Sequence, residues 1–415
     1  MVLTPLVALI GLPAWTRPLD APKLKGAMVC ALVTKLDGTI LFARNIEQRV
    51  MPASNQKLFS CAFALNMLGP DTAPETKIWV ANGQVTIDAP GDPSMTAAKL
   101  EKAAKSLGLT GNLPVQVREA YNPGWADTWQ IGDAPNRYGA AVSALTVDQG
   151  AFEIWAENGK AFLLPRSYGV EITLQPDDKA PRVDYDPFRS RLIVKGKLPD
   201  KKTRLDTLSL PNPTAAAASY FGTYSGPTTG LPASASMLVI KGDTIGTQIA
   251  SCLKPSDNNM AENLLLMGAA KLGPLGENAY ATARERINAW LEKEVGVDPN
   301  DLGLRDGSGL SRQDITTVRA INKLLRYQAK QPTFPLWRAA LAKPGEDGTL
   351  RTRLKGVPFE GKTGSLTMVI ALSGYVKRKN GELNVVSVIV NHANASSNEV
   401  RAAIDDFVKN IAELP

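Results

Sequence analysis

The sequence predicts an α/β (α+β) multidomain protein, in which both chain ends build one sheet next to a helical region and β-rich domains are inserted between them. Three observations support this prediction. The 415 residues exceed what one compact core usually organises, which favours two or three domains. Strand patterns lie near both ends of the chain. Between about 75 and 245, short strands alternate with many Pro and Gly turns.

The first predicted elements are a hairpin and a helix. Residues 27–44 contain two apolar, β-branched segments joined at Asp37-Gly38, a strong hairpin signal. A helix is predicted to begin at Ser54 and to stop at Gly69-Pro70. Its apolar residues at helical spacing are Leu58, Ala62, Leu65 and Leu68.

Helical periodicity returns beyond the insertion and predicts an all-helical region from residues 244–272, 277–295 and 315–329. Two further strands, 365–376 and 383–391, flank Asn380-Gly381, a second hairpin signal. A last helix, about 397–413, has its apolar stripe at Val400, Ile404, Phe407, Val408 and Ile411. The ends of the chain thus predict an antiparallel sheet flanked by helices.

Charge is spread along the chain. Lys and Arg number 47 against 40 Asp and Glu, a net charge of +7, without the Lys/Arg blocks of a nucleic-acid-binding surface. No nucleic-acid partner is therefore expected, while a mild attraction to anionic wall polymers or lipid headgroups leaves peripheral membrane association open. No later apolar run reaches the roughly 18 residues that span a bilayer.

The first 12 residues, MVLTPLVALIGL, have the length and apolarity of a signal-peptide core, although the first basic residue is Arg17. They are either an export signal without its basic start or a buried segment. Export, to a periplasmic or other extracytoplasmic location, is the expectation.

Metal and disulfide chemistry have little support in the composition. The three cysteines, Cys30, Cys61 and Cys252, lie in apolar runs without C-x-x-C spacing, which favours buried thiols and allows one bridge at most. The single histidine, His392, makes a zinc site or a His-dependent triad difficult to assemble. No cofactor or metal is therefore predicted.

Three short motifs occur in an informative order: Ser54-Asn55-Gln56-Lys57, then Ser256-Asp257-Asn258, then Lys362-Thr363-Gly364. Each is weak alone, because roughly one or two S-x-x-K tetrads are expected by chance. A second tetrad indeed begins at Ser251, and Ser396 begins an imitation of S-x-N. Context favours the first set, since Ser54 opens a predicted helix and the single K-T-G starts a predicted strand.

The first motif predicts a serine nucleophile with a lysine base. Residues i and i+3 share a helix face, so the Lys57 amine can reach the Ser54 hydroxyl. An ammonium cannot accept a proton, so Lys57 must be neutral during attack, and burial, the helix dipole and the cation of Lys362 would lower its pKa. For an isolated tetrad, a solvated lysine and a capping Ser54 would be the simpler interpretation.

The other two motifs predict supporting groups. Ser256 would relay a proton to the leaving amine, and Asn258 would hold Lys57 and the substrate amide; a loop and helix cap before NMAENLLLMG explain this motif equally well. Lys362 and Thr363 would clamp a carboxylate. Gly364 would admit the substrate backbone, and the N–H groups of Ser54 and Ser365 would form an oxyanion hole.

Seven segments resemble the class C low-molecular-mass penicillin-binding proteins, the D-alanyl-D-alanine carboxypeptidase/endopeptidase family: PASNQKLFS, PGDPSM, YGAAVSALTVD, KPSDNNMAENLL, RDGSGLSR, GEDGTLRTRL and GKTGSLTMVIALSGYV. The resemblance covers most of residues 27–392. It implies a catalytic domain of the penicillin-binding-protein/β-lactamase-like transpeptidase type with two nested insertions. The expected divisions are 22–75 with 245–415 for the catalytic domain, 76–150 with 206–244 for the second, and 151–205 for the third.

The resemblance also implies an activity and its partners. Ser54 would attack the penultimate D-Ala carbonyl of a peptidoglycan stem peptide, and water would hydrolyse the acyl-enzyme; β-lactam antibiotics would inhibit covalently. A terminal D-Ala as leaving group makes a carboxypeptidase and a cross-linked amine makes an endopeptidase, and the motifs do not separate them. A β-lactamase with fast deacylation and a catalytically silent wall-binding protein are the alternatives. Oligomeric state is not predicted.

Several matching residues have simpler interpretations. The turns Asp306–Gly309 and Asp347–Thr349 are expected to shape the cleft rather than to react. Trp125, Trp129 and Tyr138 are expected to pack in the insertion rather than to form a sugar-stacking platform.

Overall fold

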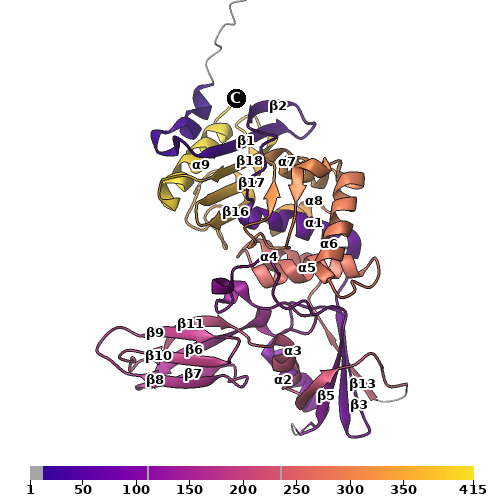
Figure 1. The fold of residues 1–415 in the computed structure, drawn as a ribbon. Helices are drawn as coiled ribbons and strands as arrows, with labels where there is room; N and C mark the ends of the chain where they lie inside the picture. The colour runs from indigo at the N-terminus through magenta and orange to yellow at the C-terminus, as the bar shows by residue number, and fades with distance from the viewer. Residues whose placement is uncertain (1–12, 110–111, 234–235) are drawn as a thin grey trace, which may run out of the picture.

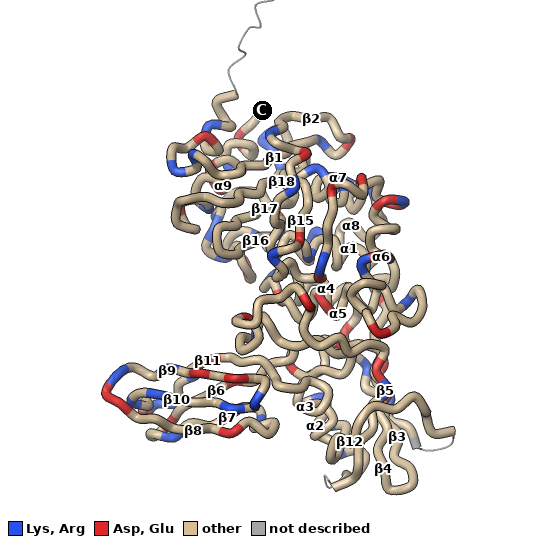
Figure 2. Tube along the Cα trace, viewed as in Figure 1, with Lys and Arg blue, Asp and Glu red and all other residues tan. Residues whose placement is uncertain are grey.

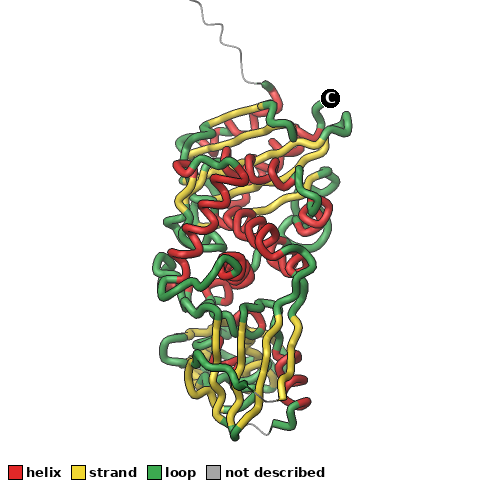
Figure 3. Tube along the Cα trace, turned by 90° about the vertical axis from the view of Figure 1, so that its right-hand side faces the viewer, coloured by secondary structure: helices red, strands yellow, loops and turns green. Residues whose placement is uncertain are grey.

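The computed structural model describes residues 13–109, 112–233 and 236–415 and shows an elongated molecule. A five-stranded sheet with helices on both faces lies at one end, and smaller sheets from residues 75–241 lie at the other (Figure 1). A layer of helices separates the two ends (Figure 3). This arrangement confirms the predicted multidomain α/β class. The proposed export signal, residues 1–12, lies outside the described residues.

The large sheet joins both ends of the chain. Its strands, all antiparallel, follow the order β16-β17-β18-β1-β2. Their bounds are Met28–Lys35 (β1), Ile40–Arg44 (β2), Phe359–Leu366 (β16), Val369–Lys377 (β17) and Leu383–Asn391 (β18). β1 and β18 pair from Met28 opposite Asn391 to Lys35 opposite Asn384. Both predicted hairpins are confirmed, because β1 leads into β2 and β17 into β18.

One face of this sheet is covered by α9 (Ser397–Ala412) and the 3₁₀ turn η1 (Ala14–Asp20). All five residues of the predicted apolar stripe of α9 are buried. The side chain of Ser396 accepts from the Glu399 N–H, and the Glu399 side chain binds the Ser396 N–H in return, which fixes the start of the helix. Ser396 is therefore a capping residue in this structure.

The helical region packs on the opposite face, around the buried helix α1. These helices are α1 (Gln56–Leu68), α4 (Ile245–Leu253), α5 (Asn258–Ala270), α6 (Ala279–Trp290), α7 (Val318–Gln328) and α8 (Phe334–Ala340). The turns η3 (Ala53–Asn55) and η8 (Pro299–Asp301) accompany them, and η7 (Leu291–Val295) continues α6 as a π-helical turn. The turn η2 (Pro22–Leu24) lies on the other face of the sheet, against α9. Every residue of α1 from Gln56 to Leu65 is buried, so this helix forms the centre of the region.

Three predicted helix boundaries in this region were wrong. The first helix begins at Gln56, because Ser54 lies in the preceding 3₁₀ turn. The segment 244–272 forms two helices, because residues 254–257 leave the helical path between α4 and α5. The helix predicted from 315 begins at Val318, because β15 (Ile315–Thr316) pairs with β14 (Leu302–Gly303).

The described residues of the insertion form three sheets, which agrees with the β-rich content predicted for this part of the chain. One sheet has the order β12-β5-β4-β3-β13, from Thr223–Pro227, Pro114–Glu119, Gln84–Ala89, Glu75–Ala81 and Ser236–Lys241. The second has the order β11-β6-β7, from Thr203–Ser209, Ala151–Glu157 and Lys160–Leu164. The third has the order β8-β10-β9, from Glu171–Gln175, Arg191–Lys195 and Arg182–Asp186. Two helices, α2 (Ala97–Ser106) and α3 (Pro213–Ala218), and the turns η4 (Ile131–Asp133), η5 (Arg137–Gly139) and η6 (Asp148–Gly150) were not predicted.

Charged residues are distributed over both ends of the molecule with the two signs interspersed (Figure 2). Among the described residues, no helix is both long enough and apolar enough to cross a membrane. The three cysteines are buried, as predicted, and are free thiols in this structure; the sulfur atoms of Cys61 and Cys252 lie 3.7 Å apart.

Candidate active site

The three motifs meet where the edge strand β16, the head of α1 and the turn between α4 and α5 come together. Ser54 lies in η3, which leads directly into α1 and its Lys57. Ser256 and Asn258 lie on either side of the α5 cap. Lys362 lies within β16, which begins at Phe359, so the K-T-G motif occupies the middle of this strand and not its start.

Lys57 and Ser54 are in direct contact. Lys57 Nζ lies 2.9 Å from Ser54 Oγ, 2.7 Å from Asn258 Oδ1 and 2.8 Å from the Ser308 carbonyl oxygen. The Lys57 side chain is fully buried, and the side chain of Ser54 caps no helix. Both simpler interpretations of the first motif, a solvated lysine and a capping serine, are therefore wrong for this tetrad.

Lys362 makes the second pair. Its Nζ donates to Ser256 Oγ at 2.8 Å and to the carbonyl oxygen of Thr363 at 2.8 Å. The lysine is fully buried, and Ser256 has a φ of +69°, in the left-handed region that a serine rarely adopts. The turn therefore places the Ser256 hydroxyl against the amine at a cost in backbone strain.

Burial changes the acidity of both amines. It lowers the pKa of Lys57, although the carboxylates of Asp306 and Glu262 oppose this shift. Burial and the positive charge of Lys57 lower the pKa of Lys362 well below its ordinary value. Two buried cations so close together disfavour each other, so the site favours a state in which one amine is neutral.

The alternative motif matches lie elsewhere. Ser251 is exposed on α4, and Lys254 forms an ion pair with Asp347 at 3.2 Å. Neither takes part in the contacts of the site described above. The order of the motifs along the chain thus identified the set that the fold brings together.

Comparison with known proteins agrees with this geometry. The sequence model of the D-Ala-D-Ala carboxypeptidase 3 (S13) family matches residues 16–208 and 229–411. The chain belongs to this family. The predicted membership is confirmed, and the protein is accordingly a D-Ala-D-Ala carboxypeptidase, a hydrolase.

Individual relatives of this S13 carboxypeptidase support the same assignment. It is 28% identical to the D-alanyl-D-alanine carboxypeptidase of Actinomadura sp. (strain R39), over 93% of this chain and 82% of that one. Penicillin-binding protein 4 (dacB) from Haemophilus influenzae has the same fold, with a TM-score of 0.78, 21% identity and coverage of 96% of this chain and 98% of the other. That relative is also known in complex with a β-lactam, with a TM-score of 0.72.

A more distant fold relative is Bd3459, a predatory peptidoglycan endopeptidase from Bdellovibrio bacteriovorus. Its TM-score is 0.55 at 14% identity, with coverage of 92% of this chain and 91% of the other. At this level of identity the likeness concerns the fold alone.

The turn Asp306–Gly309 shapes the S13 site from beneath, as expected. Asp306 accepts from the N–H groups of Ser308, Gly309 and Ser311 at 3.0, 2.6 and 2.7 Å. Glu262 accepts from the N–H groups of Gly307 and Ser308 at 2.7 and 2.8 Å. These buried carboxylates hold the Ser308 carbonyl against Lys57. The sequence could not predict the role of the Ser308 carbonyl, because every residue has one. Glu262 could have been noticed as an acidic residue within the otherwise apolar helix NMAENLLLMG.

The K-T-G strand contacts protein on both sides. Thr363 Oγ1 lies 2.8 Å from Thr349 Oγ1, so the turn Asp347–Thr349 supports the motif. A Cβ at Gly364 would lie 2.8 Å from the Pro52 carbonyl oxygen, so glycine at this position lets β16 pack against the segment before Ser54. The backbone that approaches Gly364 closely in this structure is therefore that of Pro52, whereas the sequence suggested the backbone of a substrate.

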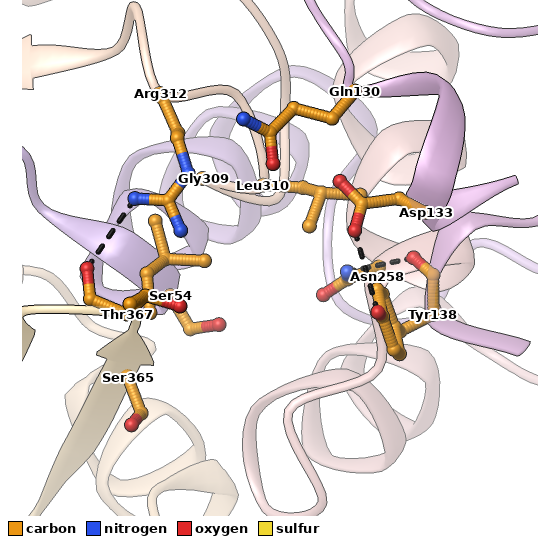
Figure 4. Close-up of a pocket in the computed structure, with 11 residues that line it drawn as sticks. Ser54, Gln130, Asp133, Tyr138, Asn258, Gly309, Leu310, Arg312, Ser365 and Thr367 are labelled. Atoms are coloured by element: carbon orange, nitrogen blue, oxygen red, sulfur yellow. Dashed lines mark hydrogen bonds between the residues drawn. The ribbon is translucent and has the colours of Figure 1, made fainter. Parts of the chain in front are cut away.

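A cavity of about 350 Å³ opens over Ser54. Figure 4 shows Arg312 on one side and Gln130, Asp133 and Tyr138 from the insertion on the other. The remaining lining residues are Asn258, Gly309, Leu310, Ser365, Leu366 and Thr367. Of the predicted site residues, Ser54, Asn258 and Ser365 line the cavity. Arg312 and the insertion residues Gln130, Asp133 and Tyr138 also line it and were not predicted as site residues.

The aromatic residues of the insertion divide into two groups. Trp125 packs against Phe188 with ring centroids 4.9 Å apart, and Trp129 Nε1 donates to Asp306 Oδ2 at 2.8 Å. Their expected packing role is confirmed. The same expectation was wrong for Tyr138, which is 48% exposed and lines the cavity.

Proposed function

We propose that this S13 carboxypeptidase cleaves D-Ala-D-Ala peptides of peptidoglycan through an acyl-enzyme on Ser54. The observation that carries the proposal is the set of contacts around Lys57. A neutral amine has two N–H donors and one lone pair. The Asn258 Oδ1 and Ser308 carbonyl oxygens can only accept, so they take the two N–H groups. The lone pair is left for the third partner, the hydroxyl of Ser54 at 2.9 Å.

In the proposed first step, Ser54 Oγ attacks the carbonyl carbon of the penultimate D-Ala while its proton passes to Lys57. The N–H groups of Ser54 and Ser365 stabilise the negative oxygen, a contribution of about 3 kcal/mol per donor in comparable acyl transfers. Ser256 protonates the leaving amine and regains a proton from Lys362, which donates to it at 2.8 Å. In the second step, water adds to the acyl carbonyl and gives a proton to the now neutral Lys362, while Ser54 Oγ leaves and takes back the proton held by Lys57, which releases the peptide as a carboxylic acid.

The remaining proposals concern binding and organisation. The hydroxyl of Thr363, within the electrostatic field of Lys362, would bind the terminal carboxylate of the peptide. The catalytic domain would comprise residues 22–75 and 245–415, with 76–150 and 206–244 as a second domain and 151–205 as a third. Because peptidoglycan lies outside the cytoplasm, the protein would be exported to the periplasm or an equivalent compartment.

The test is acylation by a labelled penicillin followed by intact-mass measurement and peptide mapping. A single adduct on the peptide that contains Ser54, lost in Ser54→Ala, is expected. Ser251→Ala is the matched control, because Ser251 begins the second S-x-x-K tetrad on exposed α4. An adduct on Ser251, or none at all, would contradict the proposal, and rapid loss of the adduct would indicate a β-lactamase.

A further inference from the structure

The turn that carries Ser256 and Asn258 is only partly held by its own helices. The Asp257 N–H donates to the Cys252 carbonyl oxygen at 3.0 Å, and Asp257 Oδ1 accepts from the Met260 N–H at 2.9 Å. With the Cys252 thiol near the Asp257 carbonyl oxygen and Lys362 on Ser256, they hold a turn in which Ser256 has a left-handed backbone with a φ of +69°. Such a conformation persists only where surrounding contacts determine it strongly.

The insertion supplies the missing contacts through η5. Arg137 Nη2 donates to Asp257 Oδ2 at 2.6 Å, and the Tyr138 carbonyl oxygen accepts from Asn258 Nδ2 at 2.8 Å. Two successive residues of the insertion thus bind two successive residues of the S-D-N motif. The side chain of Asp257 is only 6% exposed, so removal of the cation would leave a nearly buried carboxylate without its charged partner.

The Tyr138 contact determines which way the Asn258 amide points. A carbonyl oxygen only accepts hydrogen bonds, so the Asn258 NH₂ group must face Tyr138. Asn258 Oδ1 is then left facing Lys57 at 2.7 Å. If the amide turned over, Lys57 would lose one of the two acceptors that orient its lone pair toward Ser54.

The segment around η5 is rigid enough to serve as a support. A Cβ at Gly139 would lie 2.1 Å from the Asp133 carbonyl oxygen, so the turn closes tightly on a glycine. Trp125 Nε1 donates to the Gly139 carbonyl oxygen at 2.9 Å, and Trp129 donates to Asp306 beneath the site. Asn259 Nδ2 of α5 donates to the Ala141 carbonyl oxygen at 3.2 Å, so the insertion is anchored both before and after Arg137.

We propose that Arg137 is a positioning residue of the acyl transfer. Its ion pair with Asp257 docks η5 onto the S-D-N turn, and this docking holds Ser256 and Asn258 against Lys362 and Lys57. This inference rests on the proposed acylation of Ser54. It assigns the inserted part of the chain a role in the chemical step, in addition to lining the cavity.

The test compares acylation rate constants for a fluorescent penicillin. Arg137→Ala is expected to lose roughly 10- to 100-fold, because small displacements of positioned groups have effects of this size. Arg137→Lys, which keeps the charge, is expected to recover part of the rate. Arg118→Ala is the matched control: Arg118 lies in the same insertion, pairs with Asp88 at 2.7 Å and is 42% exposed against 44% for Arg137. Its rate should equal that of the unchanged protein.

Two further measurements distinguish a positioning role of Arg137 from a merely structural one. The acylation loss of Arg137→Ala should persist at temperatures well below the thermal midpoint of that variant, where it is fully folded, and with a peptide substrate the loss should appear in kcat rather than KM. In a double-mutant cycle with Asp257→Asn, the two losses should not add, because Arg137 acts through Asp257. Arg137→Gln replaces the alanine variant if that variant does not fold.

Each contrary outcome points to a different error. Unchanged acylation of the Arg137 variant, or losses that add in the cycle, would overturn the positioning role while leaving the acyl-enzyme intact. If the unchanged protein forms no adduct on Ser54, the proposed function itself fails.

Discussion

Lys57 connects the packing of the protein to its chemistry. A lysine amine is ordinarily protonated at neutral pH, and only an environment that disfavours charge makes it a base. Here the side chain is fully buried, and its hydrogen-bond partners include two oxygens that can only accept. Burial lowers the pKa of Lys57, while the carboxylates below it prevent the shift from becoming larger. The site thus retains an amine that can change its protonation state during a reaction.

The pH dependence of acylation follows from this shift. In the proposed mechanism the reactive form of Lys57 is neutral, so the fraction of reactive protein increases with pH through the pKa of Lys57 in the folded protein. Because this pKa is lowered, the acylation rate should rise with pH and level off below the ordinary lysine range. Lys57→Met should lower the rate roughly 10²- to 10⁴-fold and abolish this rise. Stopped-flow acylation across pH measures both effects.

Lys409→Met is the control for that experiment, because Lys409 lies on α9, is 48% exposed and pairs with Asp406 rather than with a residue of the cavity. It should retain the pH profile of the unchanged protein. A flat profile in the unchanged protein would mean that another group is the base.

The side chains of the site could be predicted from the sequence, but only some of their hydrogen-bond partners could. Ser54, Lys57, Ser256, Asn258 and Lys362 occur in recognisable spacings, and the fold brings all five together. The Ser308 carbonyl could not be predicted, since every residue has a backbone carbonyl and only the folded turn determines where it points. The cavity residues of the insertion depend on contacts between segments far apart in the chain, which no local pattern encodes.

At the scale of elements, the contact between α9 and the large sheet stabilises the fold and takes no direct part in the chemistry. Phe407 of α9 is fully buried between Trp15 and Phe42, with ring centroids 5.6 and 5.7 Å away. This cluster lies on the face of the sheet opposite α1. Apolar burial of this kind is the main source of stability in such a layer.

Phe407→Ala should reduce the free energy of unfolding by about 3–5 kcal/mol, because it leaves a cavity in a packed layer. Denaturant titration measures the loss. Phe188→Ala is the matched control, since Phe188 is 57% exposed and should cost about 1 kcal/mol or less. Acylation of folded Phe407→Ala should remain unchanged, and a large drop in rate at full folding would show that this layer controls the site.

Elements with long, regular patterns were predicted well, and short ones were not. β17, β18 and α9 carry continuous apolar stripes, which local sequence reports directly. The predicted strand 365–376 was wrong at its start, because the chain turns at Thr367 and Met368 and residues 365–366 belong to β16. β14 and β15 have two residues each and exist only because the chain brings them side by side. The start of α7 was misplaced for the same reason, since Ile315 is extended by its partner strand.

At the scale of the whole molecule, the three cysteines lie in one continuous core. Cys30 lies in β1, Cys61 in α1 and Cys252 in α4, and all three are fully buried. These elements come from both sides of the insertion and share a core. Exposure of the thiols therefore requires separation of the sheet from the helices, an opening that approaches global unfolding.

Thiol labelling should report that opening. Burial raises the pKa of Cys30 to about 11 and that of Cys61 well above its ordinary value, so the reactive thiolate is scarce as well as inaccessible. A thiol reagent should modify none of the three cysteines in the native protein and all three in denaturant. Phe407→Ala should accelerate labelling, because it destabilises the sheet that contains Cys30. Rapid labelling of the native protein would show that the core is open. Only one reactive thiol after unfolding without reductant would show a disulfide, either between Cys61 and Cys252 or between another pair.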